Sequence, residues 1–195
     1  MTMKKRSLVI QYNSPVVLNF AIISLCVLAL DVFTSGWSTT KFFSVYASSP
    51  TDPFAYIRLF GHVLGHAGYA HFISNMTLFL VVGPPLEEKY GSRRLLFAIV
   101  ITALVSGLVQ VFFFPTTALL GASGLVFMMI VLSSLAGARN GGIPLTLILV
   151  IIIYLGGEIM DAFTQKDNIS QLTHIVGGLC GAFLGLFAMG GKGHR

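Results

Sequence analysis

Two side chains in this apolar chain have the chemistry of a serine hydrolase. Ser123 lies in the segment Gly121-Ala122-Ser123-Gly124, and His174 follows later in the chain. A serine hydroxyl is a poor nucleophile unless an adjacent base removes its proton. A neutral imidazole can do this and can then protonate the leaving amine. We therefore expect Ser123 to be the nucleophile and His174 the base of a peptide hydrolase.

A second pair of polar residues supplies hydrogen-bond donors for the same chemistry. His71 and Asn75 are four residues apart, so a helix puts them on one face, one turn apart. A tetrahedral intermediate needs donors directed at its oxyanion. The candidates for this oxyanion hole are the backbone N–H of Ser123, the amide of Asn75 and the ring of His71.

The elements that hold these residues are predicted to be membrane helices. The 195 residues are 55% hydrophobic and only 10% charged, and the mean hydropathy is +0.85, which excludes an ordinary soluble domain. A span needs about 20 apolar residues. The apolar segments lie at about 15–34, 69–86, 93–114, 123–138, 144–161 and 170–189. This pattern predicts an all-α membrane protein with six transmembrane helices in a single domain over residues 1–195.

The basic residues give the expected orientation in the lipid bilayer. Most of them fall at one side of the predicted spans: Lys4, Lys5, Arg6, Lys89, Arg93, Arg94, Arg139, Lys192 and Arg195. The other side has Lys41, Arg58 and Lys166. The positive-inside rule therefore puts both termini in the cytoplasm, as short tails at about 1–14 and 190–195. The net charge of +5 forms no stripe that could follow phosphates, so we expect no nucleic-acid partner.

The longest connection, from about Ser35 to Gly68, is predicted to lie in the membrane interface. It is rich in aromatic residues: Trp37, Phe42, Phe43, Tyr46, Phe54, Tyr56 and Phe60. Aromatic side chains gather at the boundary between lipid and water. We therefore expect a long interfacial first loop, and not a hydrophilic linker.

Helix lengths predict that the serine lies below the outer membrane surface. The segment from Ser123 to Gly137 spans about 22 Å at 1.5 Å per residue, which is less than a hydrocarbon core of about 30 Å. The last span carries Gly177, Gly181 and Gly185 at four-residue spacing, a stripe that lets two membrane helices approach closely. We expect the fourth span to be its partner, which would bring His174 to Ser123.

These motifs together resemble the rhomboid intramembrane serine proteases, of the compact six-span bacterial type. The resemblance runs from about Tyr56 to Gly185. The residues that carry it are Gly121 to Gly124, His174 with Gly177 and Gly181, the series His62, His66, His71 and Asn75, then Arg58, and Leu86-Glu87 leading to Gly91-Ser92.

The resemblance implies an intramembrane endopeptidase with a Ser123–His174 dyad, an oxyanion hole formed with His71 and Asn75, and no cofactor. It also implies structural roles for Arg58, Glu87, His62 and His66, and supporting roles for Gly121, Gly124, Phe127, Gly177 and Gly181. The expected substrate is a single-pass transmembrane protein, cut near the outer face of a plasma membrane. The expected cleavage point is a small residue near a helix-destabilised stretch.

Three positions depart from the family pattern. Ile57 replaces a tryptophan before the loop arginine, Phe127 replaces a tyrosine, and Thr173 replaces a smaller residue. Phe127 can still stack on His174 but has no hydroxyl to donate. Thr173 is expected to affect close helix packing.

Two other functions remain open at this point. A catalytically inactive relative that binds membrane clients would have the same fold, although both dyad residues are present here. A metal-dependent membrane protein would use His62, His66 and His71 as zinc ligands, although no acidic residue stands beside them and no HExxH motif occurs.

Overall fold

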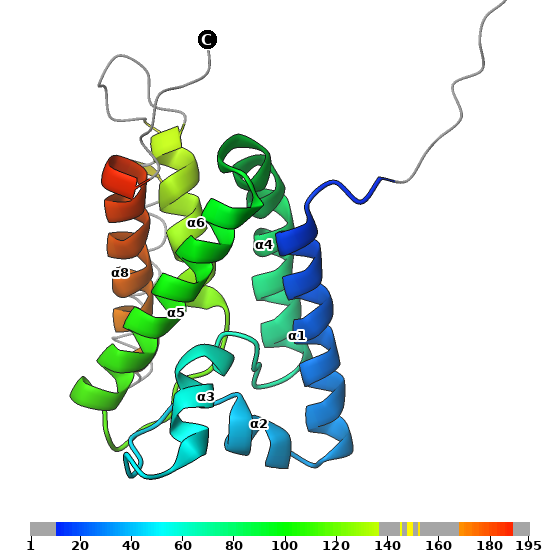
Figure 1. Cartoon of the computed structure of the whole chain (residues 1–195), viewed down its shortest axis with the longest axis vertical. Helices are drawn as coiled ribbons and strands as arrows, with labels where there is room; N and C mark the ends of the chain where they lie inside the picture. Colours follow the sequence, from blue (N-terminus) through cyan, green and yellow to red (C-terminus); the bar gives the residue numbers. More distant parts are fainter. Residues whose placement is uncertain (1–10, 137–144, 146–147, 150–151, 153–167, 189–195) are drawn as a thin grey trace, which may run out of the picture.

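The computed structural model describes residues 11–136 and 168–188, with residues 145, 148, 149 and 152, and this part of the chain is mostly helical (Figure 1). Within it, backbone pairing of the β type is limited to a bridge between Val45 and Leu119. The helices are α1 (Pro15–Phe33), α2 (Trp37–Phe42), α3 (Pro53–Gly61), α4 (Tyr69–Tyr90), α5 (Ser92–Phe113), α6 (Ser123–Ala136), α8 (Asn168–Phe183) and η1, a π-helix (Leu184–Ala188).

Five of the six predicted spans correspond to described helices. Residues 15–34, 69–86, 93–114, 123–138 and 170–189 match α1, α4, α5, α6 and α8 with η1. The fifth predicted span, 144–161, lies almost entirely outside the described residues. In the described part, α1 and α5 are long and apolar enough to cross a membrane, while Ser123–Ala136 and Thr173–Phe187 are shorter apolar helices.

One buried carboxylate joins three helices at the end where α1 begins. Glu87 of α4 accepts hydrogen bonds from the backbone N–H groups of Val16 and Val17, both at 3.0 Å, and from the hydroxyl of Ser92 at 2.7 Å. The first N–H groups of a helix have no partner within it and attract negative charge. Glu87 therefore holds α1 against α4 and against the start of α5.

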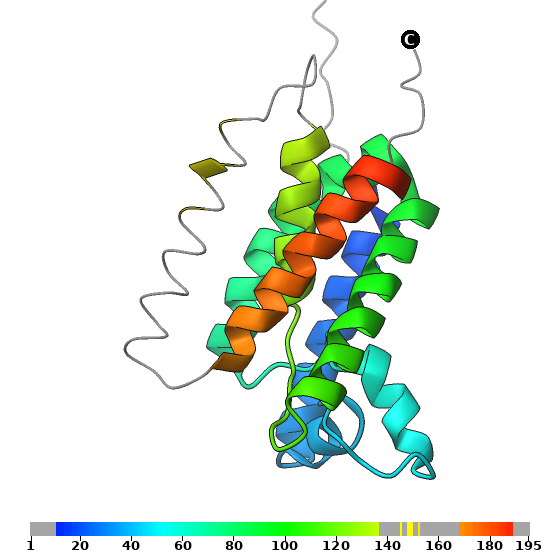
Figure 2. The same cartoon turned by 90° about the vertical axis from the view of Figure 1, so that its left-hand side faces the viewer.

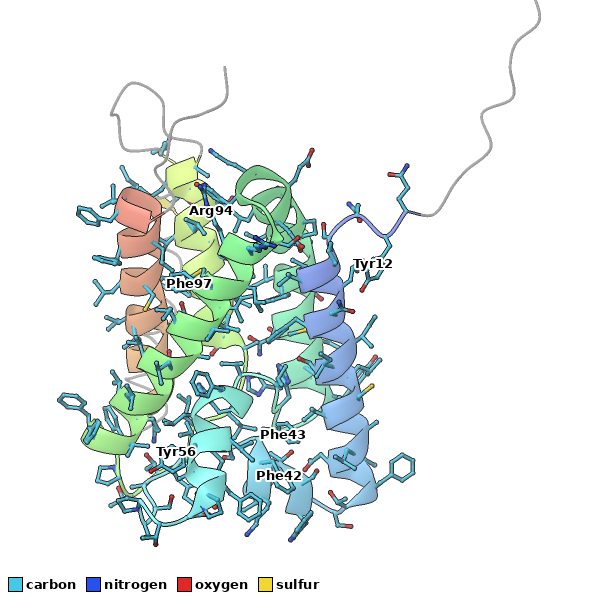
Figure 3. The ribbon with its side chains drawn as sticks, in the orientation of Figure 1. Tyr12, Phe42, Phe43, Tyr56, Arg94 and Phe97 are labelled. Carbon is cyan, nitrogen blue, oxygen red and sulfur yellow. The ribbon has the colours of Figure 1, made fainter. Side chains whose placement is uncertain are left out.

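The connection between α1 and α4 folds into two short helices, which fits the prediction that it is no simple linker. Figure 3 shows Phe42, Phe43 and Tyr56 of this connection at one end of the molecule, while Tyr12 and Arg94 lie at the opposite end. Tyr56 is exposed.

The central helix is α6, which packs against α4, α5 and α8. Its residues from Gly124 to Leu132 are all buried. Figure 1 and Figure 2 show that α6 begins well inside the molecule, above the lower ends of α1 and α5. The chain from α5 to α6 therefore enters the bundle before α6 starts, and Ser123 is the residue at that start.

Candidate active site

Ser123 follows a tight turn that is fixed from several sides. The backbone bends at Gly121, where φ is +121°. Residues with a Cβ rarely adopt this conformation. The N–H of Gly121 donates to the carbonyl of His62 at 2.9 Å, and Val45 and Leu119 exchange two backbone hydrogen bonds of 2.9 Å. The half-buried Ser123 thus opens α6 from a backbone that is held by the first loop.

His71 lies against this turn. A Cβ atom at Gly121 would stand 2.9 Å from Nε2 of His71 and 2.8 Å from its Cε1. The backbone N–H of Ala67 donates to Nδ1 of the same ring at 3.4 Å. Because Nδ1 accepts, the proton belongs on Nε2. His71 therefore presents a hydrogen-bond donor to the turn that carries Ser123.

Asn75 is buried one turn further along α4. Its side-chain nitrogen donates to the carbonyl of His71 at 3.0 Å, and the residue is 6% exposed. A side-chain amide has two N–H donors. One of them fixes the amide on its own helix, and the other can serve an oxyanion.

His174 enters the site from α8. It is half-buried, and its ring centroid lies 6.0 Å from that of Phe127, with a tilt of 36° between the planes. Phe127 therefore packs against the His174 ring, and it has no hydroxyl to donate to it.

Backbone contact between α6 and α8 holds the helices of Ser123 and His174 together. A Cβ at Gly177 would overlap the carbonyl oxygen of Gly124, and a Cβ at Gly181 would stand 2.5 Å from the carbonyl oxygen of Met128. At Gly185 the neighbours are instead leucine side chains of α6. Figure 2 shows α8 running along α6. The glycine stripe therefore faces α6, as the spacing indicated.

Thr173 also contributes to this helix contact. It is 7% exposed, and a Cβ at Gly124 would stand 2.9 Å from its Cγ2 and 3.3 Å from its carbonyl oxygen. The larger side chain at position 173 is thus accommodated because Gly124 has no side chain. Ser123 directly precedes Gly124 along α6, and His174 directly follows Thr173 along α8.

His62 and His66 are buried in the connection before α4, each 1% exposed. Their Nδ1 atoms lie 3.2 Å from the carbonyl of Arg58 and 3.1 Å from that of Leu64. The pKa of each ring is lowered to about 4, chiefly by burial, and the nearby His71 contributes to the lowering at His66. Both imidazoles are therefore neutral near pH 7 and donate to backbone carbonyls.

The zinc interpretation finds no support in this geometry. Among the described residues, no three His, Cys, Asp or Glu side chains are grouped so as to hold a metal ion. The rings of His66 and His71 meet edge to face, with centroids 5.2 Å apart. This is a packing contact between two rings.

Arg58 organises the first loop. It is 1% exposed and donates to the carbonyl of Lys41 at 3.3 Å, to the hydroxyl of Ser48 at 2.8 Å and to the carboxylate of Asp52 at 2.6 Å. The guanidinium also lies 4.3 Å from the centre of the Tyr46 ring. The hydrogen bond from Arg58 lowers the pKa of Asp52. The loop is thereby tied to the start of α3.

Asp52 and Gln110 have roles that the sequence analysis did not assign. Asp52 accepts from the N–H of Phe54 at 3.0 Å and so caps α3. Gln110 is 2% exposed and donates to the carbonyls of Phe114 and Thr117 and to the Thr117 hydroxyl, at 2.9 to 3.1 Å. The Asp52-Pro53 pair is a helix-start signal, and a glutamine within an apolar span is itself informative.

Comparison with known proteins gives a consistent match. Residues 53–190 match the family described as Rhomboid domain. Rhomboid-related protein 2 of Mus musculus is 26% identical over 185 residues, covering 84% of this chain and 61% of the relative. Rhomboid-related protein 1 of Caenorhabditis elegans is 32% identical over 138 residues, covering 66% of this chain and 38% of the relative. The chain thus spans less than two thirds of the length of either relative.

Proposed function

Because this chain belongs to the rhomboid family, we propose that it is an intramembrane serine endopeptidase in which Ser123 is the nucleophile and His174 the base. Its apolar helices and its family indicate a membrane protein. The observation that carries the proposal is the contact of Gly124 with Thr173 and Gly177. Ser123 and His174 adjoin this contact, which supports the proposal that the two side chains act in one site.

In the proposed reaction, His174 accepts the hydroxyl proton as the Ser123 oxygen bonds to the carbonyl carbon of the scissile peptide. The carbonyl oxygen becomes an oxyanion, and His71, Asn75 and the Ser123 N–H donate to it. His174 then gives its proton to the leaving amine as the C–N bond breaks. Water, activated by the same imidazole, hydrolyses the acyl-enzyme and restores the Ser123 hydroxyl.

The proposal extends to the architecture and the substrate. The chain forms one domain with six transmembrane helices, crosses a plasma membrane of bacterial inner type, and has both termini in the cytoplasm. The recessed start of α6 (Figure 1) supports entry of water from the outer face. The substrate is a single-pass transmembrane protein, because a site within the bilayer meets peptide bonds only where a helix enters it and unwinds.

The test uses purified protein in lipid vesicles with a transmembrane reporter that contains a helix-destabilised stretch. Cleavage should fall by about 10³-fold or more in Ser123→Ala and in His174→Ala, and a fluorophosphonate should label Ser123. Cleavage that persists in both variants contradicts the proposal. Loss of cleavage to a chelator would instead favour the metal-dependent alternative. A specific client complex without turnover would favour the inactive one.

A further inference from the structure

Gln110 is a polar residue in the last turn of the apolar helix α5. It is 2% exposed, and a buried amide in a membrane helix is costly unless its donors find acceptors. Its side-chain nitrogen donates to the carbonyl of Phe114 at 3.1 Å, and to the carbonyl and the hydroxyl of Thr117 at 3.1 and 2.9 Å. All three acceptors belong to the loop that leads from α5 to Ser123.

This loop leaves α5 through a tight turn. The N–H of Thr117 donates to the carbonyl of Phe114 at 3.2 Å. Pro115 is the second residue of this four-residue turn, a position at which proline is favoured. The Thr117 hydroxyl donates to the same Phe114 carbonyl at 3.1 Å. Gln110 and Thr117 therefore close the turn from two sides, and we call these two residues the loop clamp.

The loop clamp is followed by two further attachments on the way to Ser123. Leu119 and Val45 exchange two backbone hydrogen bonds of 2.9 Å, and the Gly121 N–H donates to the His62 carbonyl at 2.9 Å. Figure 1 shows the chain leaving the lower end of α5 and rising to the start of α6. The clamp fixes this path to α5, whereas the other two attachments fix it to the connection between α1 and α4. Without the clamp, the bonds of Leu119 and Gly121 alone would hold the backbone that leads into Ser123.

We propose that Gln110, acting through Thr117, is a positioning residue that fixes the loop between α5 and α6 and so aligns the hydroxyl and the backbone N–H of Ser123 for the reaction. A displacement of about 1 Å by a change far from the chemistry can lower a rate by about 10²-fold. A hydrogen bond outside the site is therefore enough to control it. The effect on catalysis rests on the proposed function, whereas the fixing of the loop does not.

The test of the loop uses Ser123→Ala protein, so that its result is independent of proteolysis. Amide hydrogen exchange is followed by mass spectrometry at Leu119 and Gly121, whose N–H groups donate to the two other attachments. Gln110→Met has a side chain of similar length but no donor. It should raise the exchange rate of both amides by about 10-fold, the factor for losing about one net hydrogen bond. Exchange rates equal to those of the parent protein overturn the proposal.

Two neighbouring threonines provide a matched pair of milder variants. Thr117→Val removes the hydroxyl of the loop clamp and should raise the exchange rates, whereas Thr116→Val makes the same change at an exposed position of the turn and should not. Gln110→Met with Thr117→Val should raise exchange by less than the product of the single effects, because the two residues share a bond. Equal increases in the two threonine variants, or a double effect equal to the product, overturn the clamp. If Gln110→Met does not fold, the threonine pair decides.

The test of the effect on catalysis measures cleavage of the transmembrane reporter by protein with Ser123 intact. The kcat should fall by up to about 10²-fold in Gln110→Met, by less in Thr117→Val and not at all in Thr116→Val, with KM little changed. An unchanged kcat in Gln110→Met, or a rise in KM alone, overturns the positioning role. A fall in kcat without faster amide exchange also overturns it, because Gln110 would then act other than through the loop. If the parent protein does not cleave the reporter, the proposed function fails, and the exchange rates still decide whether Gln110 fixes the loop.

Discussion

Gly124 of α6 and Gly177 of α8 lie in backbone contact, so close that a Cβ at position 177 would overlap the carbonyl oxygen of Gly124. A carbonyl in the middle of a packed helix pair cannot move aside as a side chain can. The separation of α6 and α8 at the level of Ser123 and His174 therefore depends on the absence of one methyl group.

Gly177→Ala is expected to push the two helices apart and to abolish most of the proposed activity. Overpacking of a tight contact costs about 1–3 kcal/mol of unfolding free energy, which exceeds the gain in helix propensity of up to about 1 kcal/mol. Thermal unfolding in detergent and cleavage in vesicles measure the two effects.

Gly178→Ala is the matched control in the same helix. The nearest atom to its new Cβ would be Cε1 of Phe127, at 2.6 Å, and a ring can rotate away. We expect a smaller loss of stability than for Gly177→Ala. Equal losses in the two variants would show that backbone contact is not the controlling feature.

His71→Ala should lower kcat by about 10²–10³-fold, because one preorganised oxyanion donor is lost. Asn75→Ala should have an effect of the same kind, and the double variant should lose less than the product of the single losses, since the two groups serve one charge. Steady-state kinetics on the transmembrane reporter give kcat and KM separately. A rise in KM with unchanged kcat would contradict an oxyanion role.

The sequence predicts the helices well because a membrane span is a matter of length and apolarity. The runs that end at Thr34 and begin at Arg93 fall within one residue of the ends of α1 and α5. The second predicted span ends at residue 86, whereas α4 continues to Tyr90, beyond Pro84 and Pro85. Prolines usually end a helix, but here the following turn carries Glu87, which is held by α1 and Ser92.

The partners of the polar residues are less predictable, because they depend on the path of the loops. Motif spacing indicated that the glycine stripe of the last span faces the fourth, and the structure has this contact. Nothing in the sequence joins Arg58 to the Lys41 carbonyl or Gly121 to the His62 carbonyl. These bonds arise only once the first loop has folded under the start of α6.

The stability of the protein should fall as the pH drops from about 6.5 toward 4, in part because of His62. Burial lowers its pKa to about 4 in the folded protein, from 6.5. Between these values the unfolded chain binds a proton that the folded chain does not, so protonation favours unfolding. Above about pH 6.5, His62 is neutral in both the folded and the unfolded chain and does not change the free energy of unfolding. Below this pH, the titration of His62 lowers the free energy of unfolding by at most about 1.4 kcal/mol per pH unit.

Unfolding in detergent at about pH 7 and about pH 5 measures this dependence. His62→Gln keeps a side-chain donor without titrating, and it should flatten the pH dependence by the His62 share. His66 has the same lowered pKa, so part of the dependence should remain. A pH dependence that is identical in His62→Gln and the parent protein would contradict the assignment.

Arg58→Ala should destabilise the first loop by about 2–3 kcal/mol, the scale for losing buried hydrogen bonds to a charged group. The guanidinium joins Lys41, Ser48 and Asp52, and no shorter side chain reaches all three. Arg58→Lys keeps the charge and the bond to Asp52 but loses the planar contact with Tyr46, so an intermediate loss is expected. Limited proteolysis of residues 43–52 measures loop opening directly. The His62 carbonyl next to this loop accepts a hydrogen bond from the Gly121 N–H. Cleavage of the reporter should therefore be reduced more by Arg58→Ala than by Arg58→Lys. Unchanged proteolysis in Arg58→Ala would show that the loop holds its shape without the arginine.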